Sequence, residues 1–262
     1  MKKLIVVLAL SFIFGGALKS SAFQMQLPIH SWGVEPHNSY IKYVEPGVMD
    51  EEGFMFGVGA TYTYHNSVMF KSEARFGFGL VHYDGTGTKD NYDYMVELRN
   101  LFGYDFIARK TTVTPFIGVG YRYLVDDFRG TTSTDAWGYI RESNYYYSPI
   151  GIEALTNMNA LWSVALLLEY DYFWQGTQKS HFSDGGTGWG DISNDQEDGY
   201  GVRGSIKLHK KGAGVNYEIE SYYIYWDIED SNYVLVPGSW GTYGYEPANY
   251  SQEYGVSITV QF

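Results

Sequence analysis

The most regular alternation in this sequence runs through Gln252-Glu253-Tyr254-Gly255-Val256-Ser257-Ile258-Thr259-Val260-Gln261-Phe262. Its apolar side chains share one parity, and polar or small residues occupy the other. Successive side chains of a β-strand point to opposite faces, so this segment predicts a strand with one apolar and one polar face. Such a strand fits any half-buried sheet, so the kind of sheet has to be inferred from the segments before it.

The same alternation recurs in residues 54–64, 70–80, 93–108, 112–126, 145–156, 161–175, 198–210 and 215–229. In the last of these the phase changes near Ser221, which predicts a β-bulge. Dyad repeats of this length suit tilted strands that cross a membrane. With residues 252–262 these make nine strands, and residues 40–45 supply a tenth, which restores the even number that single-chain bacterial barrels use. We therefore predict an all-β fold, a closed antiparallel transmembrane β-barrel of ten strands, with eight strands as the alternative.

The connections between these strands alternate in length. Short ones lie at residues 65–67, 109–111, 157–160 and 211–214, and longer ones lie at 46–53, 83–92, 127–144, 176–197 and 230–251. In outer-membrane barrels the periplasmic turns are short and the extracellular loops are long. The two sets therefore predict the sidedness of the barrel.

The first residues have the pattern of an export signal. Lys2 and Lys3 precede an apolar run over residues 4–18, and Ser20-Ser21-Ala22 follows. This predicts a secretory signal peptide, residues 1–22, cleaved after Ala22; the alternative, a retained membrane helix, needs about 20 apolar residues. One barrel domain then fills residues 23–262.

Composition limits the classes of partner and chemistry. Removing residues 1–22 takes three of the 18 Lys and Arg residues and none of the 30 Asp and Glu residues, which leaves a strongly acidic chain. Nucleic acid is therefore excluded as a partner, because its phosphates must be neutralised by Lys and Arg. The chain has no Cys, so disulfides, thiolate metal sites and Cys nucleophiles are excluded. The 26 Tyr, 15 Phe and 7 Trp with a mean hydropathy of −0.25 suit a barrel, in which only alternate residues face lipid. A soluble β-sandwich would have a similar composition.

The polar parity of the strands collects charges of both signs. A buried charge must be paired or hydrogen-bonded, so we predict a salt-bridge network filling the lumen, with a narrow ion or solute path as the alternative. Ten strands enclose little space compared with the 16–18 strands of open porins. The predicted network contains Glu73, Arg75, Glu97, Arg99, Arg122, Glu153, Glu169, Arg203, Glu218 and Glu220.

Over residues 23–262 the chain resembles bacterial outer-membrane β-barrel proteins, on the export signal, the strand alternation and the terminal aromatic. The resemblance implies residence in the bacterial outer membrane as a monomer, in contact with lipid and lipopolysaccharide. It also implies delivery by periplasmic chaperones to the barrel-assembly machinery, which would read the signal formed by Tyr254, Ile258, Val260 and Phe262.

Ten strands also make the chain similar in size to the omptin proteases. That resemblance would imply an aspartate pair in the second outer loop and an Asp-x-His pair in the fourth. Here the second loop holds Asp84 and Asp90 without an Asp-x-Asp motif, and Lys179 stands where the aspartate before His181 is required. Both elements depart from the pattern, which puts the omptin reaction in doubt. The candidates for an omptin-like or lipid-modifying hydrolase are therefore His181, Asp184, Asp84 and Asp90.

The fourth loop is acidic, with Asp184, Asp191, Asp195, Glu197 and Asp198, but it lacks the ligand spacing of an EF-hand. We predict a solvated loop, no metal and no cofactor. The main functional hypothesis is a non-enzymatic outer-membrane barrel with a structural or surface-interaction role. The alternatives are a narrow channel and an outer-membrane hydrolase that depends on His181.

Overall fold

The computed structural model describes residues 28–186 and 188–262, and it is almost entirely β-structure. The predicted signal peptide, residues 1–22, lies outside the described residues. The long strands are β1 (His30–Glu45), β2 (Met49–Asn66), β3 (Val68–Gly85), β4 (Gly87–Tyr104), β6 (Thr111–Thr131), β7 (Trp137–Asn157), β8 (Trp162–Ser180), β10 (Gly199–Lys210), β11 (Asn216–Ile228) and β14 (Asn249–Gln261). The short elements are β5 (Phe106–Ala108), β9 (Ile192–Gln196), β12 (Val234–Leu235), β13 (Tyr243–Gly244) and the 3-10 helix η1 (Phe182–Gly185).

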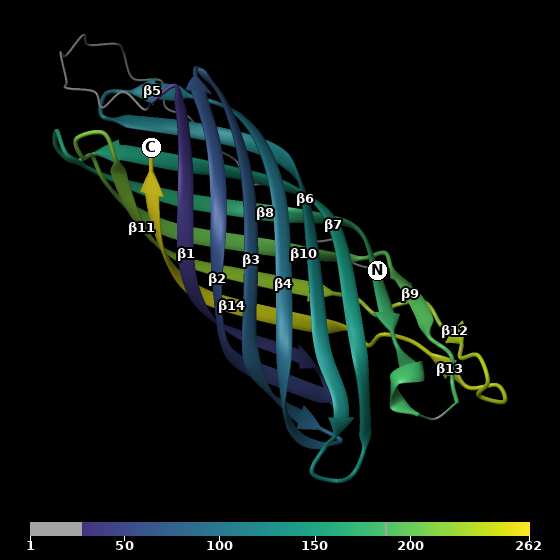
Figure 1. The fold of residues 1–262 in the computed structure, drawn as a ribbon. Helices are drawn as coiled ribbons and strands as arrows, with labels where there is room; N and C mark the ends of the chain where they lie inside the picture. Colours follow the sequence, from purple (N-terminus) through teal and green to yellow (C-terminus); the bar gives the residue numbers. More distant parts are fainter. Residues whose placement is uncertain (1–27, 187) are drawn as a thin grey trace.

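The ten long strands form a closed antiparallel barrel, as the alternation predicted. Each pairs with the next along the chain, and β14 pairs with both β11 and β1, which closes the ring. β5 extends the β4 side against β6, and β9 pairs with the outer end of β8. Figure 1 shows an elongated barrel with β5 and the C-terminus at one end and η1, β9, β12 and β13 at the other.

β1 is the strand whose length the sequence understated. It begins at His30, whereas the tenth strand, added to make the number even, was predicted at residues 40–45 only. Pro36 explains the difference, because it lacks the N–H that a strand interior needs. Pro36 pairs with Val58 of β2, and the pairing of β1 with β14 is interrupted at Glu35 and Pro36 before it resumes at His37.

Most of the predicted outer loops belong to strands that continue beyond the apolar band. β3 and β4 are joined through Thr86 alone, although residues 83–92 were predicted as a loop. β2 begins at Met49, so the turn from β1 covers only residues 46–48. β6 and β7 likewise extend into the predicted loop 127–144 and leave only residues 132–136 between them. The barrel wall therefore rises well above the membrane.

The bulge predicted near Ser221 is wrong. β11 pairs in continuous register with both β10 and β14 through that region. The apparent phase change arises because Ile224, Trp226 and Ile228 are apolar residues that face inward. A register shift does occur between β7 and β8, where Tyr146 pairs with Gln175 and Tyr147 with Phe173. It turns Gln175 outward, against the prediction from parity.

The outer face of the barrel carries a band of apolar side chains. Soluble proteins rarely expose contiguous apolar patches of more than a few hundred Å², whereas a transmembrane barrel needs such a band about 25 Å tall. Aromatic pairs border it, among them Trp32–Tyr62 with ring centroids 4.7 Å apart and Tyr40–Phe54 at 5.4 Å. Exposed members of the band include Val34, Phe56, Val58, Phe76, Phe78, Leu98, Ile117, Val119, Ile150, Leu166, Leu168, Ile206, Ile219, Val256 and Ile258. The barrel is therefore built to sit in a bilayer.

Within residues 28–186 and 188–262, none of the helical structure is long and apolar enough to cross a membrane.

Candidate functional site

A layer of ion pairs crosses the lumen at the level of Glu97 and Arg203. Arg203 projects from β10 and Glu97 from β4, and Arg203 Nη1 donates to Glu97 Oε2 at 2.9 Å. The same guanidinium lies 2.8 Å from Asp171 and 3.1 Å from Glu169 through Nε. One arginine thus holds three carboxylates from two sides of the barrel.

Two further arginines extend this layer around the wall. Arg99 Nη1 lies 2.9 Å from Glu73, and its other terminal nitrogen pairs with Glu169. Arg75 Nη2 lies 3.1 Å from Glu253 of β14 and also donates to the Tyr222 hydroxyl at 2.6 Å. The positive and negative groups of this layer pair with one another inside the barrel, as buried charges must. The pairs connect strands on different sides of the barrel. We call the set Glu73, Arg75, Glu97, Arg99, Glu169, Asp171, Arg203 and Glu253 the ionic layer.

In the part of the chain that the structure describes, the remaining predicted lumen charges form no ion pair with that layer, although Arg122 lies directly opposite Glu97. Toward the end of the barrel that holds the C-terminus, Lys207 Nζ lies 2.9 Å from Glu153 and 3.9 Å from Glu220, and His209 Nδ1 lies 3.1 Å from Glu218. Arg122 is buried, and among the described residues it has no carboxylate within ion-pair distance. Its guanidinium carbon instead lies 5.8 Å from the centre of the Trp226 ring.

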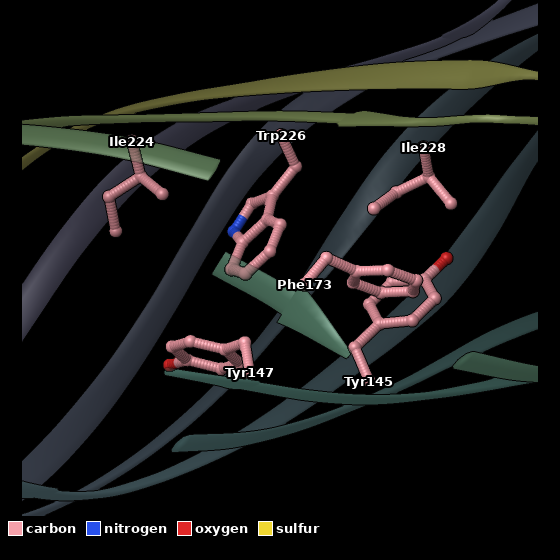
Figure 2. Close-up of a cluster of buried hydrophobic side chains, with 6 residues drawn as sticks. All are labelled: Tyr145, Tyr147, Phe173, Ile224, Trp226 and Ile228. Atoms are coloured by element: carbon pink, nitrogen blue, oxygen red, sulfur yellow. The ribbon is translucent and has the colours of Figure 1, made fainter. Parts of the chain in front are cut away.

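An aromatic cluster lies directly against the ionic layer. Figure 2 shows Trp226 between Tyr147 on one side and Tyr145 with Phe173 on the other, with Ile224 and Ile228 beside it. The Tyr147 and Trp226 rings meet edge to face at 4.9 Å. The Tyr147 hydroxyl donates to Glu97 Oε1 at 2.7 Å and accepts from Arg203 at 3.1 Å. Tyr147 therefore belongs to the aromatic cluster and is also hydrogen-bonded to the ionic layer, so it connects the two.

Inward-facing glycines make room for these rings. A Cβ added at Gly120 of β6 would lie 2.2 Å from the Tyr147 ring, and one at Gly255 of β14 would lie 2.1 Å from the Tyr222 ring. Small residues on the wall thus allow large ones to fill the centre. The sequence showed glycine on the inward parity, but not which aromatic side chain would cover it.

Two cavities lie in the lumen. One, of about 100 Å³, lies toward the end of the barrel that holds the C-terminus and is lined by Lys71, Glu73, Glu153, Lys207, Glu218 and Glu220. A second, of about 60 Å³, lies beside Arg75, Glu97, Arg99 and Arg203. Each has room for several water molecules.

At the outer end, Arg141 spans the lumen. It projects from β7 and lies 2.5 Å from Glu45 of β1, and it also pairs with Glu246 from the segment between β13 and β14. The Tyr43 hydroxyl donates to both carboxylates, at 3.0 and 3.1 Å. Burial raises the pKa of Glu246 to about 7, and the neighbouring Glu45 adds to this against the opposing effect of Arg141. The sequence did not identify this clamp, because Glu246 falls in a loop without strand periodicity.

His181 lies outside the lumen, in a chain of polar contacts. Its Nε2 lies 2.6 Å from Glu142, and its Nδ1 lies 3.3 Å from Asp191. The Ser183 hydroxyl donates to Asp191 at 2.7 Å, which lowers the pKa of Asp191. The aspartate thus stands between serine and histidine, whereas nucleophilic catalysis needs histidine to accept the serine proton. Asp184 accepts a hydrogen bond from the Ile140 amide at 3.4 Å.

The other hydrolase candidates are on a different hairpin. Asp90 lies 2.8 Å from His82, and Asp84 lies two positions further along β3 on the same outward parity. Among the described residues, no hydrogen bond or ion pair links Asp84 or Asp90 to His181. The four predicted catalytic residues therefore do not form one site.

The C-terminal strand lies at the seam of the barrel. Tyr254, Val256, Ile258 and Val260 face outward, and Glu253 faces inward to Arg75. The backbone of Phe262 exchanges two hydrogen bonds of 2.9 Å with Trp32 of β1.

No protein-family model matches the chain, and no curated protein matches its sequence. Among solved structures, the outer membrane protease OmpT from Escherichia coli is similar, with a TM-score of 0.56 and 9% identity over 89% of this chain and 95% of that one. The toluene transporter TbuX from Ralstonia pickettii has a TM-score of 0.42 and 8% identity, over 90% of this chain and 89% of that one. At these identities the likeness to OmpT concerns the fold: the chain has the architecture of an outer-membrane β-barrel.

Proposed function

We propose that this protein is an outer-membrane barrel whose lumen is closed to solutes and whose raised wall presents ordered loops to the surroundings of the cell. The observation that carries the proposal is the ionic layer, whose ion pairs cross the lumen, with the aromatic cluster packed against it. Its role is structural or in surface interaction, and specificity resides in the outer loops.

Three features support a closed lumen. The arginines of the ionic layer each pair with carboxylates on more than one strand, so they cannot swing aside without leaving buried charges unpaired. Tyr147 fixes the aromatic cluster to that layer. The cavities of about 100 and 60 Å³ are far smaller than the pores of open porins.

A liposome-swelling assay tests closure. Vesicles containing the folded protein should swell no faster in small sugars than empty vesicles do. Swelling at the rate of a porin control would overturn the proposal and favour the narrow-channel alternative.

The proposal includes export by the signal peptide cleaved after Ala22 and assembly read from Tyr254, Ile258, Val260 and Phe262. Mass spectrometry of protein from purified outer membranes should give an N-terminus at Phe23. Deleting Phe262 should slow assembly and leave unfolded protein with periplasmic chaperones. A mature chain that retains residues 1–22, or normal assembly without Phe262, would contradict these parts. Contact with lipopolysaccharide is expected along the outer aromatic border.

The surface role is tested by protease treatment of whole cells. Chymotrypsin should cut the segment between β11 and β14, which contains Tyr233, Trp240 and Tyr243 on its exposed surface. The barrel should remain intact and should migrate differently on gels before and after heating. Resistance of that segment in intact cells but not in lysed cells would place it on the periplasmic side and refute the orientation.

A further inference from the structure

A cluster of three carboxylates lies inside the outer part of the barrel, at the level of Arg141, which is directly opposite Asp126. Glu51 of β2, Asp93 of β4 and Asp126 of β6 each offer an oxygen, and these oxygens all lie within 4.8 Å of one another. Glu51 and Asp93 are buried, while Asp126 is partly exposed. Asp93 and Asp126 are directly opposed on neighbouring strands, an arrangement in which like charges repel.

The surroundings neutralise this cluster only in part, because Arg141, opposite Asp126 on β7, and Arg122 act on it from beyond ion-pair distance. Arg141, the nearest clamp arginine, already holds Glu45 and Glu246. Among the described residues, none of the three carboxylates has a Lys or Arg nitrogen within 4.0 Å. Met55 of β2, Val81 of β3 and Met95 of β4 belong to a neighbouring apolar cluster, which offers no polar partner. Three close negative charges in such a place require a counter-charge or bound protons.

A second observation points to a ligand rather than to protons. Asn91 is 1% exposed, and its amide nitrogen donates to Glu51 Oε1 at 3.3 Å, so its side chain is directed at the cluster. The other end of that amide, Oδ1, is buried without a hydrogen-bond partner, and so is Oδ1 of Asp93. Buried oxygens of this kind are rarely left unsatisfied in proteins. Both are acceptors, so a cation or a hydrogen-bond donor such as water satisfies them, whereas a further carboxylate does not.

From these contacts we infer that Glu51, Asp93 and Asp126, with Asn91 Oδ1, form a binding site for a divalent cation, best suited to Ca²⁺. Ca²⁺ takes oxygen ligands from carboxylates and amide carbonyls at about 2.3–2.6 Å. Two ligands on one ion are therefore at most about 5 Å apart, which the 4.8 Å limit of the cluster satisfies. Ca²⁺ accepts irregular geometry and six to eight ligands, whereas Mg²⁺ requires a near-ideal octahedron. Partial exposure of Asp126 leaves room for water ligands and for entry of the ion.

Bound Ca²⁺ would join β2, β4 and β6 across the interior. It would stiffen the part of the wall that rises above the membrane and hold the outer loops in place. The inference goes beyond the closed-lumen proposal, because the cluster lies above the ionic layer and neither requires the other.

Calorimetric titration of the folded, chelator-treated protein in detergent with CaCl₂ tests the site. We expect one Ca²⁺ per chain and a rise in Tm on addition of the ion. Glu51→Gln and Asp93→Asn should each weaken the affinity by about tenfold or more, as loss of a charged ligand does. Both should fold, because they keep side-chain shape and remove repulsion, and their Tm without Ca²⁺ should equal or exceed that of the wild type.

The matched controls are Asp195→Asn and Asp230→Asn, which remove acidic groups from the outer loops that line an open acidic groove. These should leave the affinity unchanged. Absence of binding up to about 10 mM, beyond the weak end of extracellular calcium sites, would overturn the inference. Loss of binding in the loop variants with retention in Asp93→Asn would do the same and would assign the ion to the loop surface. Neither result bears on closure of the lumen, which liposome swelling measures separately.

Discussion

Arg203 of β10 and Glu97 of β4 meet across the barrel, with Arg203 Nη1 2.9 Å from Glu97 Oε2. The strands β6, β7 and β8 separate them around the wall, so the contact can form only through the interior. Tyr147 donates to the same carboxylate at 2.7 Å and lies 4.9 Å from Trp226. This pair therefore joins the ionic layer to the aromatic cluster.

Removing the Arg203 guanidinium should destabilise the barrel strongly. Arg203→Ala leaves Glu97, Glu169 and Asp171 buried without their shared cation, at an expected cost of about 3–5 kcal/mol. The free energy of unfolding in urea, measured in phospholipid vesicles, gives the value. Arg129→Ala is the matched control, because Arg129 pairs with Asp127 on the exposed outer part and should cost less than about 1 kcal/mol. Equal losses of unfolding free energy in the two variants would show that the buried ion pairs of Arg203 contribute no more to stability than an exposed pair does.

Substitutions at Trp226 and Tyr147 should distinguish the contribution of packing to stability from that of hydrogen bonding. Trp226→Ala removes the centre of the aromatic cluster, and we expect a loss of about 3–5 kcal/mol. Tyr147→Phe keeps the ring but leaves Glu97 without one donor, for which we expect about 1–3 kcal/mol. The same unfolding measurement applies. A larger loss for Tyr147→Phe than for Trp226→Ala would mean that packing contributes little here.

Gly120 should tolerate no larger side chain. An added Cβ would lie 2.2 Å from the Tyr147 ring, so Gly120→Val must push that ring away from Glu97. Overpacking of this kind costs about 1–3 kcal/mol. At Gly204 of β10 an added Cβ would meet nothing closer than 3.8 Å, so Gly204→Ala is the control. Hydrogen–deuterium exchange of β6 and β7 should rise in Gly120→Val alone, and unchanged exchange would contradict the placement of the ring.

Docking of the segment that contains Glu246 should depend on pH. The docked state raises the pKa of Glu246 from 4.5 to about 7, so it binds a proton that the undocked state releases. Docking is then strongest below pH 4.5 and weakens as pH rises toward 7, by about 3 kcal/mol in the limit of a fully buried group. Hydrogen exchange of residues 229–248, corrected for intrinsic rates, should show less protection at pH 8 than at pH 5.

Glu246→Gln provides the control for that pH dependence. The amide keeps the contact with Arg141 and cannot ionise, so protection should be nearly equal at the two pH values. Protection that increases with pH in the wild type would reverse the predicted sign and reject the assignment to Glu246.

The sequence predicted the strands of the barrel wall better than the contacts between side chains inside the lumen. Within the membrane, lipid requires apolar residues on one face of every strand, and that pattern predicted nine strands and their phase, while the even strand number of such barrels supplied the tenth. Above the membrane the wall no longer faces lipid, so residues 83–92 and 127–144 lack the apolar alternation and were predicted as loops. The first half of β1 was not predicted, because Pro36 is unusual inside a strand. Parity alone placed Gln175 inside the barrel, but the register shift opposite Tyr146 turns it outward.

Which side chains meet inside the lumen depends on the stagger of the strands and on how far apart those strands lie around the barrel. Parity placed Arg203 and Glu97 inside, but their meeting across β6, β7 and β8 follows from the tilt of the closed sheet, which no local pattern records. The three-carboxylate cluster was missed for the same reason. Asp93 and Asp126 were on the inward parity, but Glu51 fell in a predicted turn, and only the register brings the three together. His181 was singled out by residue type, whereas its partners Glu142 and Asp191 come from other segments.

Planar-bilayer conductance of the wild-type barrel tests the central claim most directly. The filled lumen predicts no steady current under an applied voltage, at any salt concentration that preserves the fold. Trp226→Ala and Arg203→Ala, if folded on heat-modifiability gels, should allow brief openings. Steady, ion-selective openings of the wild type would contradict the account, because the ionic layer and the aromatic cluster would then line a pore instead of closing one.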